Sequence, residues 1–348
     1  MEATSQVVLR NEARLTGESL LVVNPSRDML AQRLESNNRE VRLSTQDFGD
    51  FRWLEAAGFR ASFDAVPPVT GEEDTVVLTL PREKDRLIMM LHAIAARLNP
   101  AARVWLVGEN RAGIKSSAHH LESAFGRVTV LDKARHCGLF EAREPLPKRP
   151  FELADYLAPW SLTFAGRELR LLSLPGVFAH GRLDPGSALL LETLRQLNPA
   201  GSVLDFACGS GVIGLALALG RSDVQLTLAD SSALALESCR MSMEANDLRS
   251  SLLPSDGLAE LSGRFDWIVS NPPFHRGVRN DLGIAADFFR AAGTFLADNG
   301  RIVIVFNQHL PYLQWLRQEF EQVDRLAGGG DYTIAQARRP RLRRRNAK

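Results

Sequence analysis

The sequence predicts an α/β protein made of two tandem domains, each with a doubly wound and mostly parallel sheet. Three observations predict this fold. The second half alternates apolar strand segments with helical segments, a pattern typical of parallel sheets whose two faces are covered by helices. The first half repeats this pattern more weakly, and a proline-rich run at 144–150 separates the halves. The chain has 348 residues, which is enough for two domains of ordinary size.

In the second half, the expected elements follow one another in regular alternation. Each strand is a short apolar run, and each helix has apolar residues at helical spacing. Three consecutive glycines at 328–330, between two β-prone stretches, predict a hairpin at the edge of the sheet. Strands are expected at 202–206, 224–229, 265–270 and 301–306, and helices at 212–219, 232–246 and 284–296.

The first half indicates a degenerate copy of the second. Apolar strands are expected at 20–23, 76–80 and 103–107, at positions that match strands of the second half. Asn24 and Pro25 follow the first of these strands without a Gly-x-Gly pattern, so this domain would share the fold but lack a cofactor loop. Two unrelated α/β domains are the alternative, and different strand orders in the two halves would favour it.

Proline content and charge divide the chain into segments. Three prolines between 145 and 150 fix the backbone and remove hydrogen-bond donors, so neither a helix nor a central strand can continue through them. Six arginines, one lysine and no acid occupy the last twelve residues, which leaves 35 basic against 41 acidic residues elsewhere. This segment predicts a local contact with a polyanion, and a solvated, disordered tail is the alternative. The expected organisation is a first domain at 1–144, a linker at 145–155, a second domain at 156–336 and a basic tail at 337–348.

The composition excludes several classes of protein. Hydrophobic residues make up 45% of the chain and charged residues 24%, so the sequence is not disordered, collagen-like or a disulfide scaffold. The chain has only three cysteines, no apolar run long enough to span a membrane, and no apolar signal-peptide core within residues 1–18. We therefore expect a cytoplasmic protein that does not associate with a membrane.

A glycine-rich turn follows the strand at 202–206. Gly209 and Gly211 allow the backbone to turn sharply and approach a ligand closely. Asp230 comes at the end of the next strand, where a carboxylate accepts hydrogen bonds from ribose hydroxyls. By itself, this pattern fits a nicotinamide dehydrogenase about as well as a methyltransferase.

Two further acids favour the methyltransferase. Asp205 would place a negative charge beside the loop, which suits the cationic methionine portion of S-adenosylmethionine and would repel a pyrophosphate. Asp256, after the next expected strand, can accept a hydrogen bond from the adenine amino group. The expected cofactor is therefore S-adenosylmethionine.

The tetrapeptide Asn-Pro-Pro-Phe at 271–274 predicts the chemistry. An exocyclic or amide nitrogen is a poor nucleophile because its lone pair is delocalised. The side-chain oxygen of Asn271 and the carbonyl of Pro272 can accept hydrogen bonds from its two N–H groups and stabilise the positive charge that develops during methyl transfer. Asn271 would also border the cofactor, while Phe274 would stack on the planar substrate beside Pro273.

Other candidate residues carry less information. His275 could contact a substrate phosphate, and a structural or surface histidine is the alternative. The remaining histidines and cysteines lack the spacing of metal ligands, so no metal is expected. Arg338 and Arg339, in the basic tail, are predicted to bind a nucleic-acid substrate.

Longer motifs indicate a family. They are Val-Gly-Glu-Asn-Arg-Ala-Gly at 107–113, Cys-Gly-Leu-Phe at 137–140, Leu-Pro-Gly-Val-Phe at 174–178, Leu-Asp-Pro-Gly-Ser at 183–187 and Asn-Pro-Pro-Phe-His at 271–275. On these residues, and over nearly its full length, the chain resembles the bacterial 16S ribosomal RNA (guanine-N2)-methyltransferase C family.

The resemblance implies two tandem Rossmann-like methyltransferase domains, of which only the second binds S-adenosylmethionine while the first aids folding and RNA binding. It implies methylation of guanosine 1207 (reference bacterial numbering) in 16S rRNA, within an assembled small ribosomal subunit. Asp184 and Ser187 would lie near the methionine end of the cofactor or near the catalytic loop. A monomer is expected.

Several alternatives remain open at this point. The large-subunit (23S rRNA) guanine-N2 methyltransferases, with a similar layout and tetrapeptide, are the closest. A glutamine-N5 methyltransferase is another, although that family has tyrosine in place of Phe274 and a smaller, helical first domain. A ribosome-assembly factor with incidental methylation belongs to a different class, and a dehydrogenase leaves the tetrapeptide unexplained.

Overall fold

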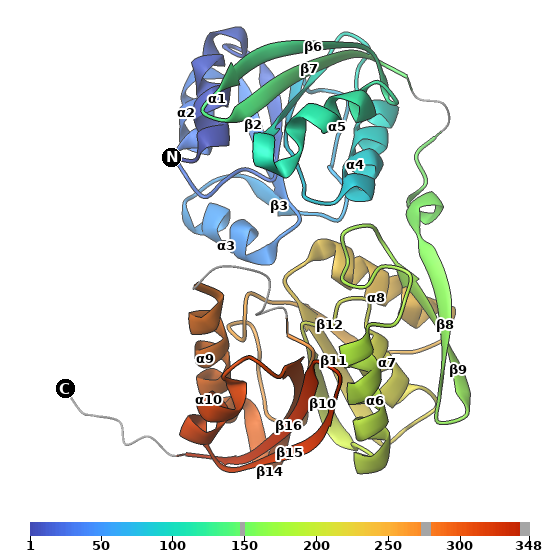
Figure 1. Ribbon diagram of the computed structural model, residues 1–348. Helices are drawn as coiled ribbons and strands as arrows, with labels where there is room; N and C mark the ends of the chain where they lie inside the picture. Colours follow the sequence, from blue (N-terminus) through green and yellow to red (C-terminus); the bar gives the residue numbers. More distant parts are fainter. Residues whose placement is uncertain (147–149, 273–279, 342–348) are drawn as a thin grey trace, which may run out of the picture. The chain divides into compact units, whose positions relative to one another are not determined.

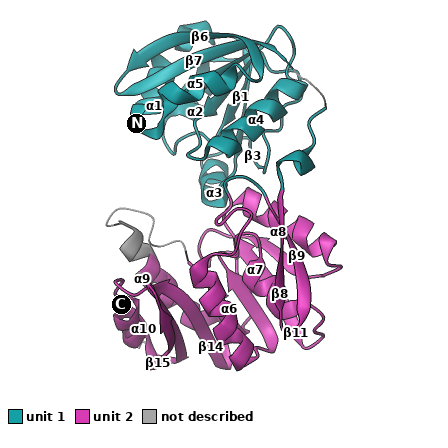
Figure 2. Ribbon diagram, turned by 45° about the vertical axis from the view of Figure 1, so that its right-hand side comes forward, with its two compact units in different colours: residues 1–157, 174–176 teal, residues 158–173, 177–348 magenta. Residues whose placement is uncertain are grey.

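The contacts between residues divide the chain into two compact units (Figure 2). The first unit contains residues 1–157 and 174–176, and the second contains 158–173 and 177–348. The change of unit at 157 lies just beyond the predicted linker at 145–155. The computed structural model describes residues 1–146, 150–272 and 280–341 (Figure 1).

The first unit is a seven-stranded sheet with helices on both faces. Its elements are β1 (Ser19–Val23), β2 (Glu40–Thr45), β3 (Ala61–Phe63), β4 (Thr75–Thr79), β5 (Arg103–Glu109), β6 (Phe125–Ala134), β7 (Cys137–Pro145), α1 (Ala3–Arg10), α2 (Leu30–Asn37), α3 (Phe48–Ala56), α4 (Lys84–Arg97) and α5 (Ile114–Leu121). The strand order is β3-β2-β1-β4-β5-β7-β6, in which β7 alone pairs antiparallel with both neighbours. Helices α1 to α3 cover one face, and α4 and α5 cover the other.

The second unit repeats this architecture. Its elements are β8 (Ala158–Phe164), β9 (Arg167–Ser173), α6 (Pro185–Leu197), β10 (Gly201–Phe206), α7 (Val212–Ala218), β11 (Val224–Asp230), α8 (Ala233–Ala245), β12 (Ser251–Pro254), β13 (Phe265–Ser270), α9 (Asn280–Ala292), β14 (Leu296–Asn307), α10 (Tyr312–Glu319), β15 (Phe320–Gly329) and β16 (Tyr332–Pro340). Helices α6 to α8 and the β8–β9 hairpin cover one face, while α9 and α10 cover the other.

The two sheets have the same strand order. In the second unit the order is β12-β11-β10-β13-β14-β16-β15, and β16 alone pairs antiparallel with both neighbours. Each position corresponds to one in the first sheet, with β1 matching β10 and β4 matching β13. The predicted fold class, two tandem doubly wound sheets, is confirmed. The common order also supports the degenerate copy rather than two unrelated domains.

The central strands are buried on both faces, as expected of parallel strands between helical layers. In β10, Val203 packs in the cluster that includes α6 and α7, whereas Leu204 packs in the cluster that includes α9 and α10. All five residues of β1 are buried as well. No helix within the described residues is both long and apolar enough to cross a membrane.

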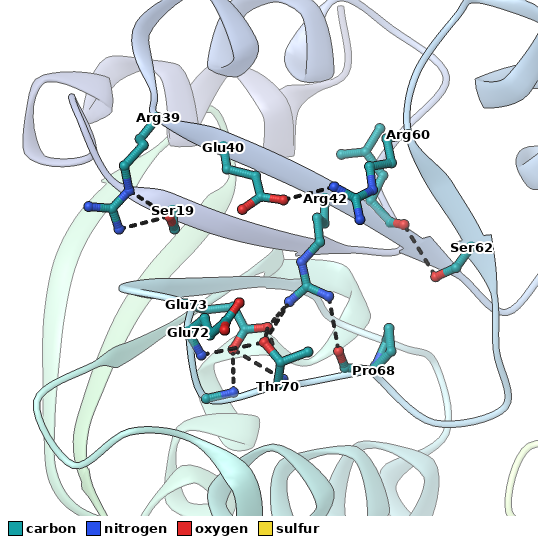
Figure 3. Close-up of polar contacts among 12 residues, drawn as sticks. Ser19, Arg39, Glu40, Arg42, Arg60, Ser62, Pro68, Thr70, Glu72 and Glu73 are labelled. Atoms are coloured by element: carbon teal, nitrogen blue, oxygen red, sulfur yellow. Dashed lines mark hydrogen bonds and ion pairs between the residues drawn. The ribbon is translucent and has the colours of Figure 1, made fainter.

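A buried ion pair stabilises the loop before β4 in the first unit (Figure 3). The Glu73 carboxylate is 2% exposed and pairs with the Arg42 guanidinium from β2. Glu73 also accepts hydrogen bonds from the backbone N–H groups of Thr70, at 3.0 Å, and Gly71, at 2.9 Å. Gly71 has a φ of 91°, which favours glycine in this tight turn. The buried Glu73 carboxylate therefore fixes this turn by accepting hydrogen bonds from the guanidinium and from two backbone N–H groups.

The start of the predicted basic tail is wrong. Residues 337–340 lie in β16, where Ala337 is fully buried and pairs with Ile302 of β14. Arg338 pairs with Arg301 across the same two strands, and its guanidinium lies 3.0 Å from Asp324. The basic composition concealed the strand, because its buried part, residues 333–337, carries no arginine and the two arginines follow only at its partly exposed end.

Candidate active site

Three loops meet at the carboxyl edge of the second sheet, where β10, β11 and β13 end. The Ser270 hydroxyl donates a hydrogen bond to the Phe206 carbonyl at 2.7 Å, which joins the ends of β13 and β10. The N–H of Cys208 donates to the Ala229 carbonyl at 3.1 Å, which joins the loop after β10 to β11. These bonds hold the loops in a fixed relation to one another.

The loop after β10 turns through three residues with positive φ. They are Ala207, at 55°, Gly209, at 57°, and Gly211, at 81°. A Cβ added at Gly209 would have no atom within 4 Å, and Gly209 lines a cavity, so this glycine keeps the cavity open. A Cβ at Gly211 would lie 2.9 Å from the Cys239 sulfur, so this glycine permits close packing behind the loop. The two glycines thus have different roles.

Asp230 links this loop to the next helix. Its Oδ2 accepts the Gly209 N–H at 2.9 Å, and its Oδ1 accepts the Ser232 N–H at 2.9 Å. Asp256 follows β12, which pairs with β11, and its side chain is exposed. The structure therefore places Asp230 against the glycine loop and Asp256 in the adjacent loop.

Asp205 lies beneath the glycine loop and does not line the cavity, contrary to the expectation that its charge faces the cofactor. It lies within β10, its side chain is fully buried, and its Oδ2 accepts the Gly214 N–H of α7 at 2.8 Å. Burial raises the pKa of Asp205 to about 7, although the Gly214 hydrogen bond opposes the change. The carboxyl group is therefore placed to hold the start of α7 rather than to touch a ligand.

Asn271 lines the same cavity as Gly209. Its Nδ2 donates hydrogen bonds to Asp184 Oδ2, at 3.1 Å, and to Ser187 Oγ, at 2.9 Å. Asp184 and Ser187 also line the cavity, at the N-terminus of α6. Pro272, which follows Asn271 in the sequence, is buried, whereas Pro273, Phe274 and His275 lie outside the described residues.

Two predicted substrate residues lie away from this cavity. β16 runs antiparallel to β14, so Tyr332 is near the carboxyl edge, opposite Asn307, whereas Arg338 is nearer the amino edge, opposite Arg301. Arg339 follows it and is exposed. Neither arginine lines the cavity, so a role in substrate binding would have to be exercised at a distance from Asn271.

One aromatic residue at the cavity was not singled out as a site residue by the sequence. Phe178 lines the cavity and is 39% exposed, which is unusual for a large apolar side chain. It ends the Leu-Pro-Gly-Val-Phe motif, and that motif was the only signal that could have indicated it. Among the described residues, no group of three histidine, cysteine or acidic side chains gathers to hold a metal ion.

Comparisons with known proteins decide the family. The Methyltransferase small domain N-terminal model matches residues 5–160, and the Methyltransferase small domain model matches residues 168–336. The ribosomal RNA small subunit methyltransferase C of Shewanella pealeana is 35% identical over 333 residues, covering 95% of this chain and 97% of the relative. That of Pseudomonas aeruginosa strain LESB58 is 38% identical over 340 residues, covering 97% and 100%. The chain belongs to the ribosomal RNA small subunit methyltransferase C family.

A solved structure agrees with this family. The T. thermophilus 16S rRNA N2 G1207 methyltransferase, in complex with AdoMet and guanosine, aligns with a TM-score of 0.86 and 26% identity. The alignment covers 97% of this chain and 92% of that chain. The resemblance expected from the motifs is confirmed, and the enzyme class, a methyltransferase, is confirmed with it.

Proposed function

We propose that this methyltransferase transfers a methyl group from S-adenosylmethionine to the exocyclic N2 of guanosine 1207 in 16S rRNA of the small ribosomal subunit. The observation that carries the proposal is the presence of Asn271 and Gly209 in one cavity, at the ends of adjacent parallel strands. The names of the relatives and the AdoMet and guanosine bound by the T. thermophilus protein support the same donor and acceptor.

The residues at the carboxyl edge fit the cofactor. Gly209 offers its backbone without a side chain in the way, and the Asp230 carboxylate beside it can accept hydrogen bonds from ribose hydroxyls. Asp256, in the loop after β12, is proposed to accept a hydrogen bond from the adenine amino group. When bound, S-adenosylmethionine supplies an electrophilic methyl group.

Asn271 and Pro272 act on the acceptor nitrogen. The N2 amino group of guanine is a poor nucleophile because its lone pair is shared with the ring. The Asn271 Oδ1 and the Pro272 carbonyl accept hydrogen bonds from its two N–H groups, favour a pyramidal nitrogen and stabilise the developing positive charge. Phe274, which lies outside the described residues, remains predicted to stack on the base. A paired or stacked guanosine must leave its stack before N2 can reach these acceptors.

The first unit is proposed to bind no cofactor, because side chains fill the corresponding strand ends. Asn24 follows β1, as the glycine loop follows β10, and its Nδ2 donates to Gln46 Oε1 at 3.2 Å. Arg86 of α4 donates to the same Gln46 oxygen through Nε, at 2.9 Å, and Nη2, at 2.6 Å. The Gln46 side chain is thus 3% exposed, and its oxygen is bonded to two other side chains of the protein. Calorimetric titration should find one S-adenosylmethionine per chain, and a second binding event would contradict this assignment.

The remaining expectations concern partners. A ribosomal substrate, unlike a free nucleotide, explains why a domain besides the catalytic one is useful, and the first unit is proposed to aid RNA binding. A ribosomal target also implies a cytoplasmic location. A monomer and the absence of a metal requirement remain predictions. The basic segment near the C-terminus is proposed to bind rRNA phosphates.

The decisive experiment incubates the protein with labelled S-adenosylmethionine and separated ribosomal subunits, then maps the label. We expect the label on a guanine N2 of the small subunit. The Asn271→Ala variant should lose about 100-fold or more in rate at saturating substrates, with cofactor affinity nearly unchanged. Label on the large subunit would favour the 23S alternative, and full turnover by Asn271→Ala would refute the role of the amide.

A further inference from the structure

The N-terminus of α6 holds the side-chain amide of Asn271 by two hydrogen bonds. Asp184 is the N-cap of α6, where its Oδ2 accepts the Ser187 N–H at 3.0 Å. The same oxygen accepts Nδ2 of Asn271 at 3.1 Å, and Ser187 Oγ accepts it at 2.9 Å. Ser187 is 3% exposed. One carboxylate oxygen therefore caps the helix and binds the amide of Asn271.

The carboxylate determines which end of the amide points toward α6. An ionised carboxylate can only accept hydrogen bonds, so Nδ2 of Asn271 must face it and Oδ1 must face away. A hydroxyl both donates and accepts, so Ser187 alone would tolerate either orientation. If the amide turned over, Oδ1 would meet the Asp184 oxygen with no proton between them, and the acceptor needed for the guanine amine would be replaced by a donor.

The platform that carries Asp184 is closely packed. A Cβ added at Gly186, between Asp184 and Ser187, would lie 2.9 Å from the Tyr332 ring and 3.0 Å from Asp184 Oδ2. Pro185 occupies the first turn of α6, where its fixed φ favours the helix start. Gly186 therefore lets the first turn of α6 pack closely against Tyr332 of β16, next to the capping oxygen.

From these contacts we propose that Asp184 and Ser187 are positioning residues for methyl transfer. Asp184 sets the orientation of the Asn271 amide so that Oδ1 is presented to the guanine amine, and Ser187 fixes its position. The inference rests on the proposed function, because it concerns the same acceptor. It predicts that the rate of the chemical step depends on an oxygen acceptor at position 184, while substrate and cofactor binding do not.

The test compares two substitutions of Asp184 that both keep a good N-cap. Asp184→Asn retains an oxygen at the same reach and should keep a single-turnover rate within severalfold of the unchanged protein. Asp184→Ser has a side chain too short to cap Ser187 and reach Asn271 together, so its rate should fall at least tenfold. Melting temperature, KM for the small subunit and cofactor affinity should stay nearly constant in both variants.

Two further variants separate positioning from folding. Asp47 caps α3 in the first unit by accepting the Asp50 N–H at 3.0 Å, so Asp47→Ser makes the same cap change in a residue that does not line the cavity and should retain the full rate. Ser187→Ala leaves its backbone N–H in the cap and should lower the rate several-fold, even if Asp184→Ser fails to fold.

The outcomes distinguish the two proposals. If the unchanged protein does not methylate the small subunit, the proposed function fails. If it does and Asp184→Ser is equally fast, or if both Asp184 variants are equally slow, the positioning role is overturned. A loss of cofactor affinity parallel to the loss of rate would also overturn it.

Discussion

Asp205 Oδ2 accepts the backbone N–H of Gly214 at 2.8 Å, inside a region from which water is excluded. The other oxygen, Oδ1, is buried without a hydrogen-bond partner among the described residues. A carboxylate in this setting loses its hydration and recovers only one bond in return, which is why burial raises its pKa to about 7. The strand that ends in the glycine loop therefore carries an acid that is half protonated near neutral pH.

This acid makes stability depend on pH. Between the ordinary value of 3.8 and about 7, the folded protein binds this proton more tightly than the unfolded chain does. The contribution of Asp205 to the free energy of unfolding therefore falls as pH rises from about 4 to about 7 and is constant above that range. The whole difference is on the order of 4 kcal/mol.

The Asp205→Asn variant replaces the carboxyl group by a neutral group of similar shape. The free energy of unfolding of the variant minus that of the unchanged protein should increase as pH rises across this range. The stability advantage of the variant should therefore be largest at pH 8. Urea denaturation at several pH values measures this difference. Parallel pH profiles for the two proteins would show that Asp205 does not titrate there.

Gly209→Ala should mainly lower cofactor affinity, whereas Gly211→Ala should mainly lower stability. The methyl group at position 209 meets no protein atom, so stability should fall only by the ~1–2 kcal/mol cost of a positive φ while cofactor affinity drops sharply. At position 211 the methyl group lies 2.9 Å from the Cys239 sulfur, so the melting temperature should fall much further. Thermal unfolding and cofactor titration of both variants decide the matter, and a reversed order would contradict the roles assigned to the two glycines.

The ion pair in the first unit should be sensitive to removal of one partner. Glu73→Ala removes the carboxylate from Arg42, which keeps only the Pro68 carbonyl and the Thr70 hydroxyl, and from two backbone donors, which should cost ~1.5–3 kcal/mol. Glu72→Ala, at the exposed neighbouring position, should change the free energy of unfolding by about 0.5 kcal/mol or less. Chemical denaturation of the first unit's transition measures both, and equal losses would show that the buried pair has no special weight.

Because β16 runs to Pro340, a truncation that tests the basic segment should begin after Arg341. Removing 342–348 deletes three arginines and one lysine and leaves the sheet complete. Binding to rRNA should weaken, and the slope of log affinity against log salt should become shallower by up to about 3. A filter-binding series over salt concentration checks this, and an unchanged slope would remove the segment from the RNA interface.

Local sequence patterns were sufficient to predict most strands. β13 runs from Phe265 to Ser270, as expected, because an apolar run ends there at Asn271 and Pro272. The helix expected at 284–296 differs, since α9 ends at Ala292 and Leu296 already belongs to β14. The apolar pattern continues through both elements, and the break comes at Gly293, where a Cβ would lie 2.7 Å from Pro340. A contact so distant in sequence cannot be seen in a local window.

The same distinction applies to the site. The contact between Gly209 and Asp230 could be predicted because the ends of neighbouring parallel strands share one edge of a sheet. The burial of Asp205 could not be predicted, because a strand pattern does not say whether a carboxylate near the end of the strand faces a ligand or a helix. The contact between Asp184 and Asn271 spans 87 residues and depends on how α6 packs, so only the resemblance hinted at it.

The order of strands along the chain also bears on how the protein is made. All strands of the first sheet lie before residue 146, and all strands of the second lie after residue 200, with no exchange between them. During translation, the emerging polypeptide can close its earlier sheet before the later one has been synthesised. Biogenesis of this enzyme can thus proceed as two successive events, and the half that carries the chemistry is the last to form.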